Sequence, residues 1–186
     1  MKKEDINIRW HGRGGQGAIT AAKIVAKATF DSGYKGVVMA PTFGTERRGA
    51  PVITSLKLSR EKIYDLSPID RPDIVVVMDY LLLEEAGVTD GLKPGGIIVI
   101  NTPKPANEYE IKGIKVAAAD VTAISIEAGL GGMVNAGIIG VLAKAMGFLD
   151  LKMLDDYIKE EFQGKRPEEN SRAFMTSYEK TVIKEG

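Results

Sequence analysis

A glycine-rich turn near the amino terminus constrains the fold of this chain more than any other feature of its sequence. The pattern G-x-G-x-x-G is matched by Gly12, Gly14 and Gly17. Strand-forming residues 6–10 precede the turn, and residues 18–30 follow it with apolar side chains at helical spacing. Together with a second apolar run at 37–40, this order has the length of a βαβ unit.

The rest of the chain repeats the alternation of strands and helices. Residues 74–78 and 97–100 are continuous apolar runs, as in strands buried on both faces, and 114–118 is a weaker third run. We therefore predict an α/β fold that is Rossmann-like and doubly wound. It should have a mostly parallel sheet, helices on both faces and a helical C-terminal part.

Two further segments are assigned from their patterns. Residues 51–58 alternate as a half-solvated strand does, and 168–184 have the spacing of a last helix. The length of the chain suits one well-filled core. We expect residues 1–186 to form a single domain, with the helices from about residue 121 packing on the same core.

Composition narrows the possible functions. The chain has 25 basic and 25 acidic side chains, so no overall charge favours nucleic acid. It has no cysteine and a single histidine, His11, so it cannot bind an iron-sulfur cluster through its own thiolates, and no catalytic residue or metal site is expected. No apolar run approaches the roughly 20 residues of a membrane span, and no signal-peptide pattern occurs. We expect a cytoplasmic protein without membrane contact.

The glycine turn can bind an anion. Gly12 would allow the tight turn, and Gly14 and Gly15 would let the backbone approach a ligand. Gly17 would let the following helix lie close to the sheet. The free N–H groups of the first helical turn favour phosphate. The alternative is a turn that only joins strand to helix.

Two common nucleotide sites do not fit. The second strand, residues 36–41, ends without the carboxylate that holds the ribose of a nicotinamide dinucleotide. The turn is also not followed by the Gly-Lys-Ser/Thr of a Walker loop. A nicotinamide dehydrogenase is therefore disfavoured.

A charged segment follows the second strand at the edge where the loops of such a fold converge. Its members are Glu46, Arg47 and Arg48. Arginine suits bidentate contact with phosphate, and Glu46 could pair with one arginine and orient it. The alternative is a solvated charged loop, which contributes little.

The two motifs together resemble the gamma subunit of pyruvate and related 2-oxoacid:ferredoxin oxidoreductases. The resemblance rests on RWHGRGGQG at 9–17 and FGTERRGAP at 43–51. It continues through Pro72-Asp73 and the valine strand, LKPGG at 92–96, and a helix that contains Asn135. It implies a reaction in which pyruvate or 2-oxoisovalerate, coenzyme A and oxidised ferredoxin give acyl-CoA, carbon dioxide and reduced ferredoxin.

The same resemblance implies a division of labour. Thiamine diphosphate, magnesium and the iron-sulfur clusters would lie in partner subunits, named alpha, beta and a ferredoxin-like delta, with external ferredoxin as the electron acceptor. The gamma chain would help to assemble the complex and contribute to coenzyme A binding. The candidate cofactor-binding residues are Gly12, Arg13, Gly14, Gly15, Gln16, Gly17, Glu46, Arg47 and Arg48.

Roles for these residues follow from their chemistry. Arg13 and Arg48 would supply charge to phosphate, Gln16 a hydrogen bond, and Glu46 orientation. The same groups could instead contact a partner subunit. A stand-alone Rossmann-like module that binds a nucleotide or coenzyme A is the alternative function. His11 is expected to be packed and hydrogen-bonded, and Trp10 to lie in the core.

Overall fold

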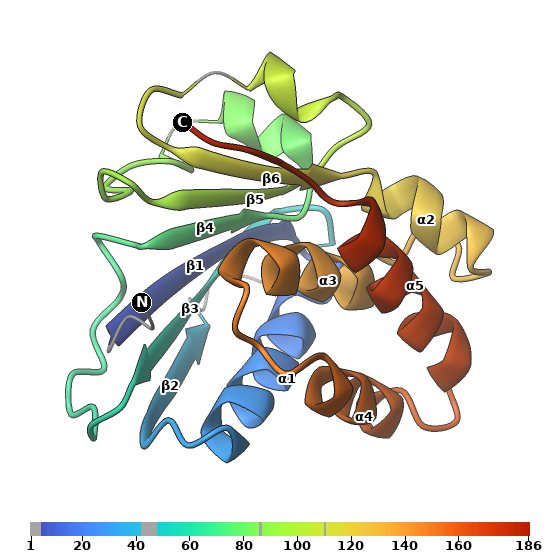
Figure 1. Ribbon diagram of the computed structural model, residues 1–186, viewed down its shortest axis with the longest axis horizontal. Helices are drawn as coiled ribbons and strands as arrows, with labels where there is room; N and C mark the ends of the chain where they lie inside the picture. Colours follow the sequence, from blue (N-terminus) through green and yellow to red (C-terminus); the bar gives the residue numbers. More distant parts are fainter. Residues whose placement is uncertain (1–4, 42–47, 86, 110) are drawn as a thin grey trace.

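A computed structural model describes residues 5–41, 48–85, 87–109 and 111–186. Figure 1 shows a sheet with a layer of helices against it. The elements, in chain order, are β1 (Asp5–Arg13), α1 (Ala18–Asp31), β2 (Gly36–Pro41), β3 (Pro51–Ser59), β4 (Ile74–Val77), the 3-10 helix η1 (Tyr80–Glu84), β5 (Ile97–Asn101), the 3-10 helix η2 (Ala106–Glu108), β6 (Lys115–Ala119), α2 (Val121–Glu127), α3 (Asn135–Met146), α4 (Leu151–Glu161), α5 (Pro167–Lys180) and β7 (Val182–Lys184).

The sheet is mixed and mostly parallel, as predicted. Its strand order is β2-β3-β1-β4-β5-β6-β7. β1, β4, β5 and β6 are parallel neighbours, whereas β3 is antiparallel to both β1 and β2, so β2 runs in the direction of β1. Only nine residues separate Pro41 from Pro51. That is fewer than a parallel crossover needs, so β3 returns antiparallel and lies between the first two strands of the predicted βαβ unit.

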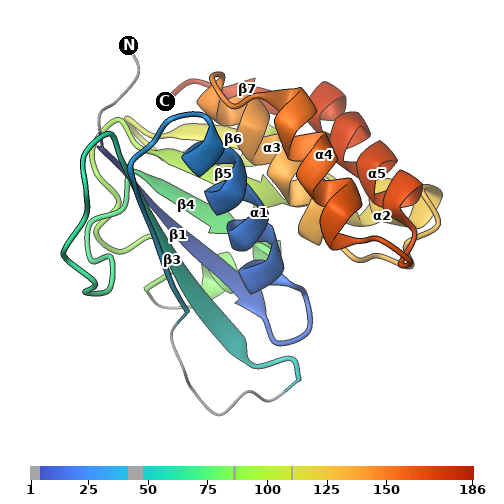
Figure 2. The same ribbon diagram turned by 90° about the horizontal axis from the view of Figure 1, so that it is seen from below.

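One face of the sheet is covered by α1, α3, α4 and α5 (Figure 2). The opposite face of β4, β5 and β6 packs against the segments that carry η1 and η2. We predicted helices on both faces of the sheet, and the helices on this second face are the short 3-10 helices η1 and η2. The connecting segments 78–96 and 102–114 contain several glycines and prolines, which interrupt longer helices.

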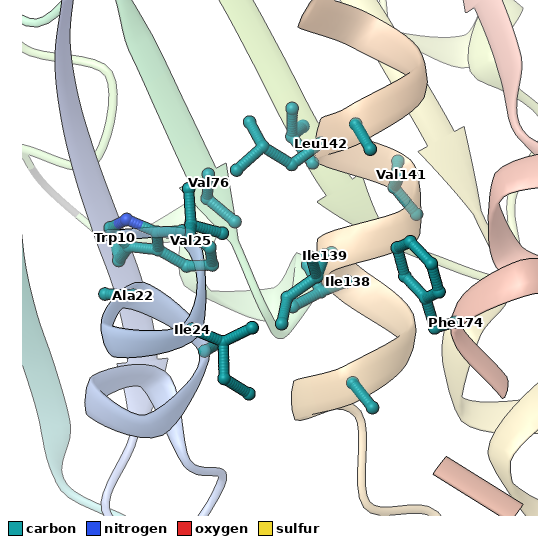
Figure 3. Close-up of a cluster of buried hydrophobic side chains, with 14 of the residues drawn as sticks. Trp10, Ala22, Ile24, Val25, Val76, Ile138, Ile139, Val141, Leu142 and Phe174 are labelled. Carbon is teal, nitrogen blue, oxygen red and sulfur yellow. The ribbon is translucent and has the colours of Figure 1, made fainter. Parts of the chain in front are cut away.

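The main core lies between the sheet and these helices (Figure 3). Trp10 is completely buried, as predicted, and belongs to the same core cluster as Val25 of α1. The small residues of α3 allow its backbone to approach α5. A Cβ atom built on Gly140 would lie 2.2 Å from the carbonyl oxygen of Phe174. Larger side chains there would force the two helices apart.

Two segments differ from the sequence prediction. β3 was predicted to expose one face to solvent, but its polar side chains Ser55 and Lys57 are buried. The Lys57 ammonium donates to Asp65 in the loop that follows β3. The prediction of a last helix over residues 168–184 was wrong at its carboxyl end. α5 ends at Lys180, and the chain then continues as β7, whose backbone pairs with the open edge of β6. In the described part of the chain, no helix combines the length and apolar character needed to cross a membrane.

Candidate functional site

The glycine turn and the segment after the second strand meet at the carboxyl end of β1. Arg13 pairs in register with Pro51 of β3. The Gly14 N–H donates to the Ala50 carbonyl at 2.8 Å, and the Gly49 N–H donates to the Gly14 carbonyl at 3.1 Å. The expected meeting of the two stretches at one rim of the sheet is confirmed for these residues. Glu46 and Arg47, also candidates, lie outside the described residues.

Local geometry explains why the turn is rich in glycine. Gly15 and Gly17 have backbone φ angles of 95° and 79°, which residues other than glycine rarely adopt. Gly12 still belongs to β1, where a Cβ atom would lie 3.2 Å from the sulfur of Met78. The Gln16 side-chain oxygen accepts from the Arg13 N–H at 2.7 Å, so it closes the turn.

The start of α1 presents backbone donors to an open cleft. The helix begins after Gly17 without a side-chain cap, and its first intrahelical bond runs from Ala21 to Gly17. The N–H groups of residues 18–20 therefore have no acceptor within the helix. The cleft has a volume of about 610 Å³. It is lined by Arg13, Gly14, Gly15, Gly17, Ala18, Ile19, Thr20, Arg48, Val52, Met133 and Asn135.

The two arginines of the cleft differ in their partners. Arg13 Nε lies 2.7 Å from Asp79 and its Nη2 lies 3.1 Å from Glu85. The hydrogen bond to Asp79 is the main reason why the pKa of Arg13 is raised. Arg48 is exposed and has no ion pair or side-chain hydrogen bond with any residue that the structure describes. A Cβ atom on Gly15 would lie 3.8 Å from Arg48 Cγ, so Arg48 lies beside the glycine turn.

This difference bears on the roles predicted for the arginines. Two carboxylates balance the guanidinium charge of Arg13 and hold it against the start of η1, which Asp79 caps through the Leu81 N–H. Arg48 lines the cleft, and none of the carboxylates in the described ranges pairs with it, so its guanidinium suits an anion there.

Asn135 is a member of the site that sequence reasoning left out of its candidates. It is the first residue of α3 and only 4% exposed. Its Oδ1 accepts from the Ala136 N–H at 3.0 Å, whereas its Nδ2 donates to no residue in the described ranges. A Cβ atom on Gly17 would lie 2.7 Å from that Nδ2. The available signal was a single amide at the start of a helix whose next eight residues are all apolar or small.

His11 lies beneath the turn as a packed, hydrogen-bonded residue, as expected. It is 5% exposed, and its Nε2 accepts from Arg9 Nε at 3.0 Å. Burial, followed by the nearby Arg9 charge, lowers the pKa of His11 to about 4. The imidazole is therefore neutral at neutral pH. Arg9 in turn donates to the carbonyls of Val88 and Asp90, which ties the next loop to β1.

Comparison with known proteins identifies the family. A family model described as pyruvate ferredoxin/flavodoxin oxidoreductase matches residues 7–180. The "Pyruvate/ketoisovalerate oxidoreductases common subunit gamma" of Thermococcus kodakarensis is 44% identical over 97% of this chain and 99% of that protein. The "Pyruvate synthase subunit PorC" of Methanocaldococcus jannaschii is 40% identical over 97% of this chain and 99% of that protein.

Solved structures agree with this similarity. The pyruvate oxidoreductase subunit PORC of Thermotoga maritima superposes with a TM-score of 0.84 at 30% identity, covering 98% of this chain and all of that one. The chain therefore belongs to the pyruvate ferredoxin/flavodoxin oxidoreductase family. These three relatives match over nearly their whole length and are gamma or PorC subunits, so this chain is a gamma-type subunit of a 2-oxoacid:ferredoxin oxidoreductase.

Proposed function

We propose that this subunit serves an enzyme that converts pyruvate or 2-oxoisovalerate, coenzyme A and oxidised ferredoxin to acyl-CoA, carbon dioxide and reduced ferredoxin. The printed names of its relatives, which mention pyruvate and ketoisovalerate, support this substrate class. The chain lacks cysteine, and its described residues hold no cluster of three or more potential metal ligands. The thiamine and iron-sulfur chemistry is accordingly assigned to alpha, beta and ferredoxin-like delta partners.

In this proposal the cleft at the start of α1 contributes to coenzyme A binding. The ligand carries a pyrophosphate and a 3'-phosphate, and backbone donors at a helix N-terminus together with an arginine suit such anions. The observation that carries the proposal is the position of Arg48, a cation that lies beside Gly15 and the uncapped first turn of α1 and pairs with no residue in the described ranges. This fold matches 30% of the chain of a 2-oxoglutarate:ferredoxin oxidoreductase from Magnetococcus marinus, with a TM-score of 0.75 at 23% identity, and that enzyme was solved with 2-oxoglutarate, coenzyme A and succinyl-CoA bound.

Titration calorimetry of coenzyme A into the assembled enzyme tests this role. Arg48→Ala should weaken binding about tenfold, because a charge-assisted contact to phosphate is lost. Arg71→Ala is the matched control, since Arg71 is also exposed and precedes β4 at the opposite rim of the sheet. Unchanged affinity in the Arg48 variant would remove Arg48 from the coenzyme A site and favour contact with a partner subunit.

A further inference from the structure

The connection between β3 and β4 lies on the face of the sheet that points away from α1, α3, α4 and α5. Trp10 and Leu56 belong to the core on the helical side, so the alternation of side chains along a strand directs Arg9 and Lys57 to the opposite face. Residues 60–73 form no helix or strand, and Figure 2 shows them as a loop that extends from the sheet away from the helical layer. Both Arg9 and Lys57 contact this loop.

A buried lysine holds the middle of this connection. The Lys57 side chain is only 10% exposed, and its ammonium lies 2.7 Å from a carboxylate oxygen of Asp65 and 3.4 Å from the hydroxyl of Ser67. The other carboxylate oxygen of Asp65 accepts from the Ser67 N–H at 2.9 Å. Because a buried ammonium without acceptors is costly, these contacts fix the backbone at residues 65–67.

Two further contacts hold the segment 63–69 on either side of this lysine. Toward β3, Ile63 packs at the start of β2, where a Cβ atom on Gly36 would lie 2.8 Å from Ile63 Cγ1. Toward β4, Ile69 is 5% exposed, and its carbonyl accepts from Arg9 Nη1 at 3.3 Å. The segment is therefore anchored at its two ends and at its middle.

Between these anchors, Tyr64 and Leu66 project into solvent. Their exposed fractions, 86% and 69%, are the highest of the large hydrophobic residues that the structure describes. They flank Asp65, whose carboxylate is turned toward Lys57. Single exposed apolar side chains are common, whereas two neighbouring ones on an anchored segment are typical of an interaction site. The anchors also mean that little conformational freedom would be lost on binding.

The shape and charge of this surface indicate a protein partner. Side chains this exposed line no cavity, so they would enter a socket in another molecule rather than enclose a small ligand. A second copy of the chain fits poorly, because two side chains fall well short of the roughly 800 Å² that each partner of a stable dimer contributes. The charges of residues 60–71 cancel, which disfavours nucleic acid and anionic membranes. These charges are Arg60, Lys62 and Arg71 against Glu61, Asp65 and Asp70.

We propose that Tyr64 and Leu66 insert into an apolar socket on a partner subunit of the same enzyme, an inference that rests on the proposed assembly of this chain with other subunits. The relatives of this chain are subunits of larger enzymes, so the assembled enzyme supplies a protein surface for this face. The segment 63–69 is already anchored, so docking orders few groups. Tyrosine is also among the residues that contribute most to the binding energy of interfaces.

Competition for the partner subunits tests this surface. Wild-type chain and a variant with a distinguishable tag are co-expressed with the other subunits, and mass spectrometry measures the ratio of the two chains in the assembled enzyme. The double variant Tyr64→Ser/Leu66→Ser should be incorporated at least about tenfold less than wild type. Phe30→Ser is the matched control and should compete equally, because Phe30 is also 59% exposed but lies on α1, on the other face of the sheet.

Several results would overturn the proposal. Equal incorporation of the double variant, or an equal loss with Phe30→Ser, would show that the pair does not dock. Urea denaturation of the isolated chain should give the same midpoint for the double variant and wild type, and a clearly lower midpoint would mean that the pair packs on its own chain. A wild-type dimer that the double variant abolishes would assign the pair to a second copy instead.

Failure of the proposed function gives a different result. If the wild-type chain is recovered with no other subunit, assembly itself fails and both proposals are overturned. If the double variant is incorporated normally and Arg48→Ala still weakens coenzyme A binding, only the surface of Tyr64 and Leu66 is excluded.

Discussion

The amide of Asn135 packs directly against Gly17, so that a Cβ atom on Gly17 would lie 2.7 Å from Asn135 Nδ2. This contact joins the first residue of α3 to the residue that precedes α1, across 118 positions of sequence. It places a buried side-chain donor beside the backbone donors of the α1 first turn. The glycine turn is thus completed by a residue from a distant helix.

Replacement of Gly17 should destabilise the chain by two separable effects. Gly17→Ala forces alanine into the left-handed region at φ 79° and against the Asn135 amide. Gly147→Ala is the control, because Gly147 has a φ of 69° but no atom within 4 Å of the added Cβ. We expect about 1–2 kcal/mol of destabilisation in the control and about 1–3 kcal/mol more in Gly17→Ala. Urea denaturation measures both, and equal losses would contradict the packing contact.

Asn135→Asp should weaken coenzyme A binding while preserving the fold. The substitution replaces the Nδ2 donor, which has no acceptor among the described residues, with a second oxygen, and a negative charge would then face the phosphates of the proposed ligand. The first turn of α1 stabilises a carboxylate at this place, so we expect the midpoint of thermal unfolding to change by a few degrees at most. Calorimetry should give at least about tenfold weaker binding. Wild-type affinity in the variant would show that the amide does not face the ligand.

The stability of the chain should fall between neutral and mildly acidic pH because of His11. Its pKa is lowered to about 4 in the folded chain from the ordinary 6.5, so within this window the unfolded chain binds a proton that the folded chain does not. Stability is therefore fully present above the ordinary pKa and is lost as the pH falls toward 4, by about 2–3 kcal/mol.

A neutral substitution isolates this contribution from that of the carboxylates. His11→Gln retains an acceptor for Arg9 without titrating, so its urea denaturation midpoint should change less between about pH 7.5 and 4.5 than that of wild type. His11 is the only histidine in the chain, so no second imidazole complicates the comparison. Parallel pH profiles for the two proteins would refute the prediction.

Purification from the native source should give a brown complex that contains thiamine diphosphate and iron. This chain has no cysteine to hold a cluster, so the colour must come from partner subunits. The outcome is checked in the purified fraction that contains this chain. Visible absorption from thiolate-to-iron charge transfer reports the clusters, and chemical analysis measures iron and thiamine diphosphate. A colourless protein that elutes alone and binds a nucleotide would favour a stand-alone binding module.

Much of the fold followed from local patterns. The strand, glycine turn and helix at the amino terminus and the buried runs that became β4 and β5 appear where the sequence predicted them. These features depend on neighbours along the chain, through hydrophobic period and glycine conformation. The family resemblance likewise needed only the two motifs and their spacing.

The tertiary structure decided which groups of the site have partners. Arg13 was expected to meet phosphate, but it is held by Asp79, 66 positions away, and by Glu85. Asn135 reaches Gly17 only because α3 and α1 pack side by side on one face of the sheet. β3 lies between β1 and β2 in the sheet, so Arg48, just before β3, lies beside the glycine turn that follows β1. Hydrogen bonds and ion pairs depend on distances between side chains, and the packing of strands and helices sets those distances.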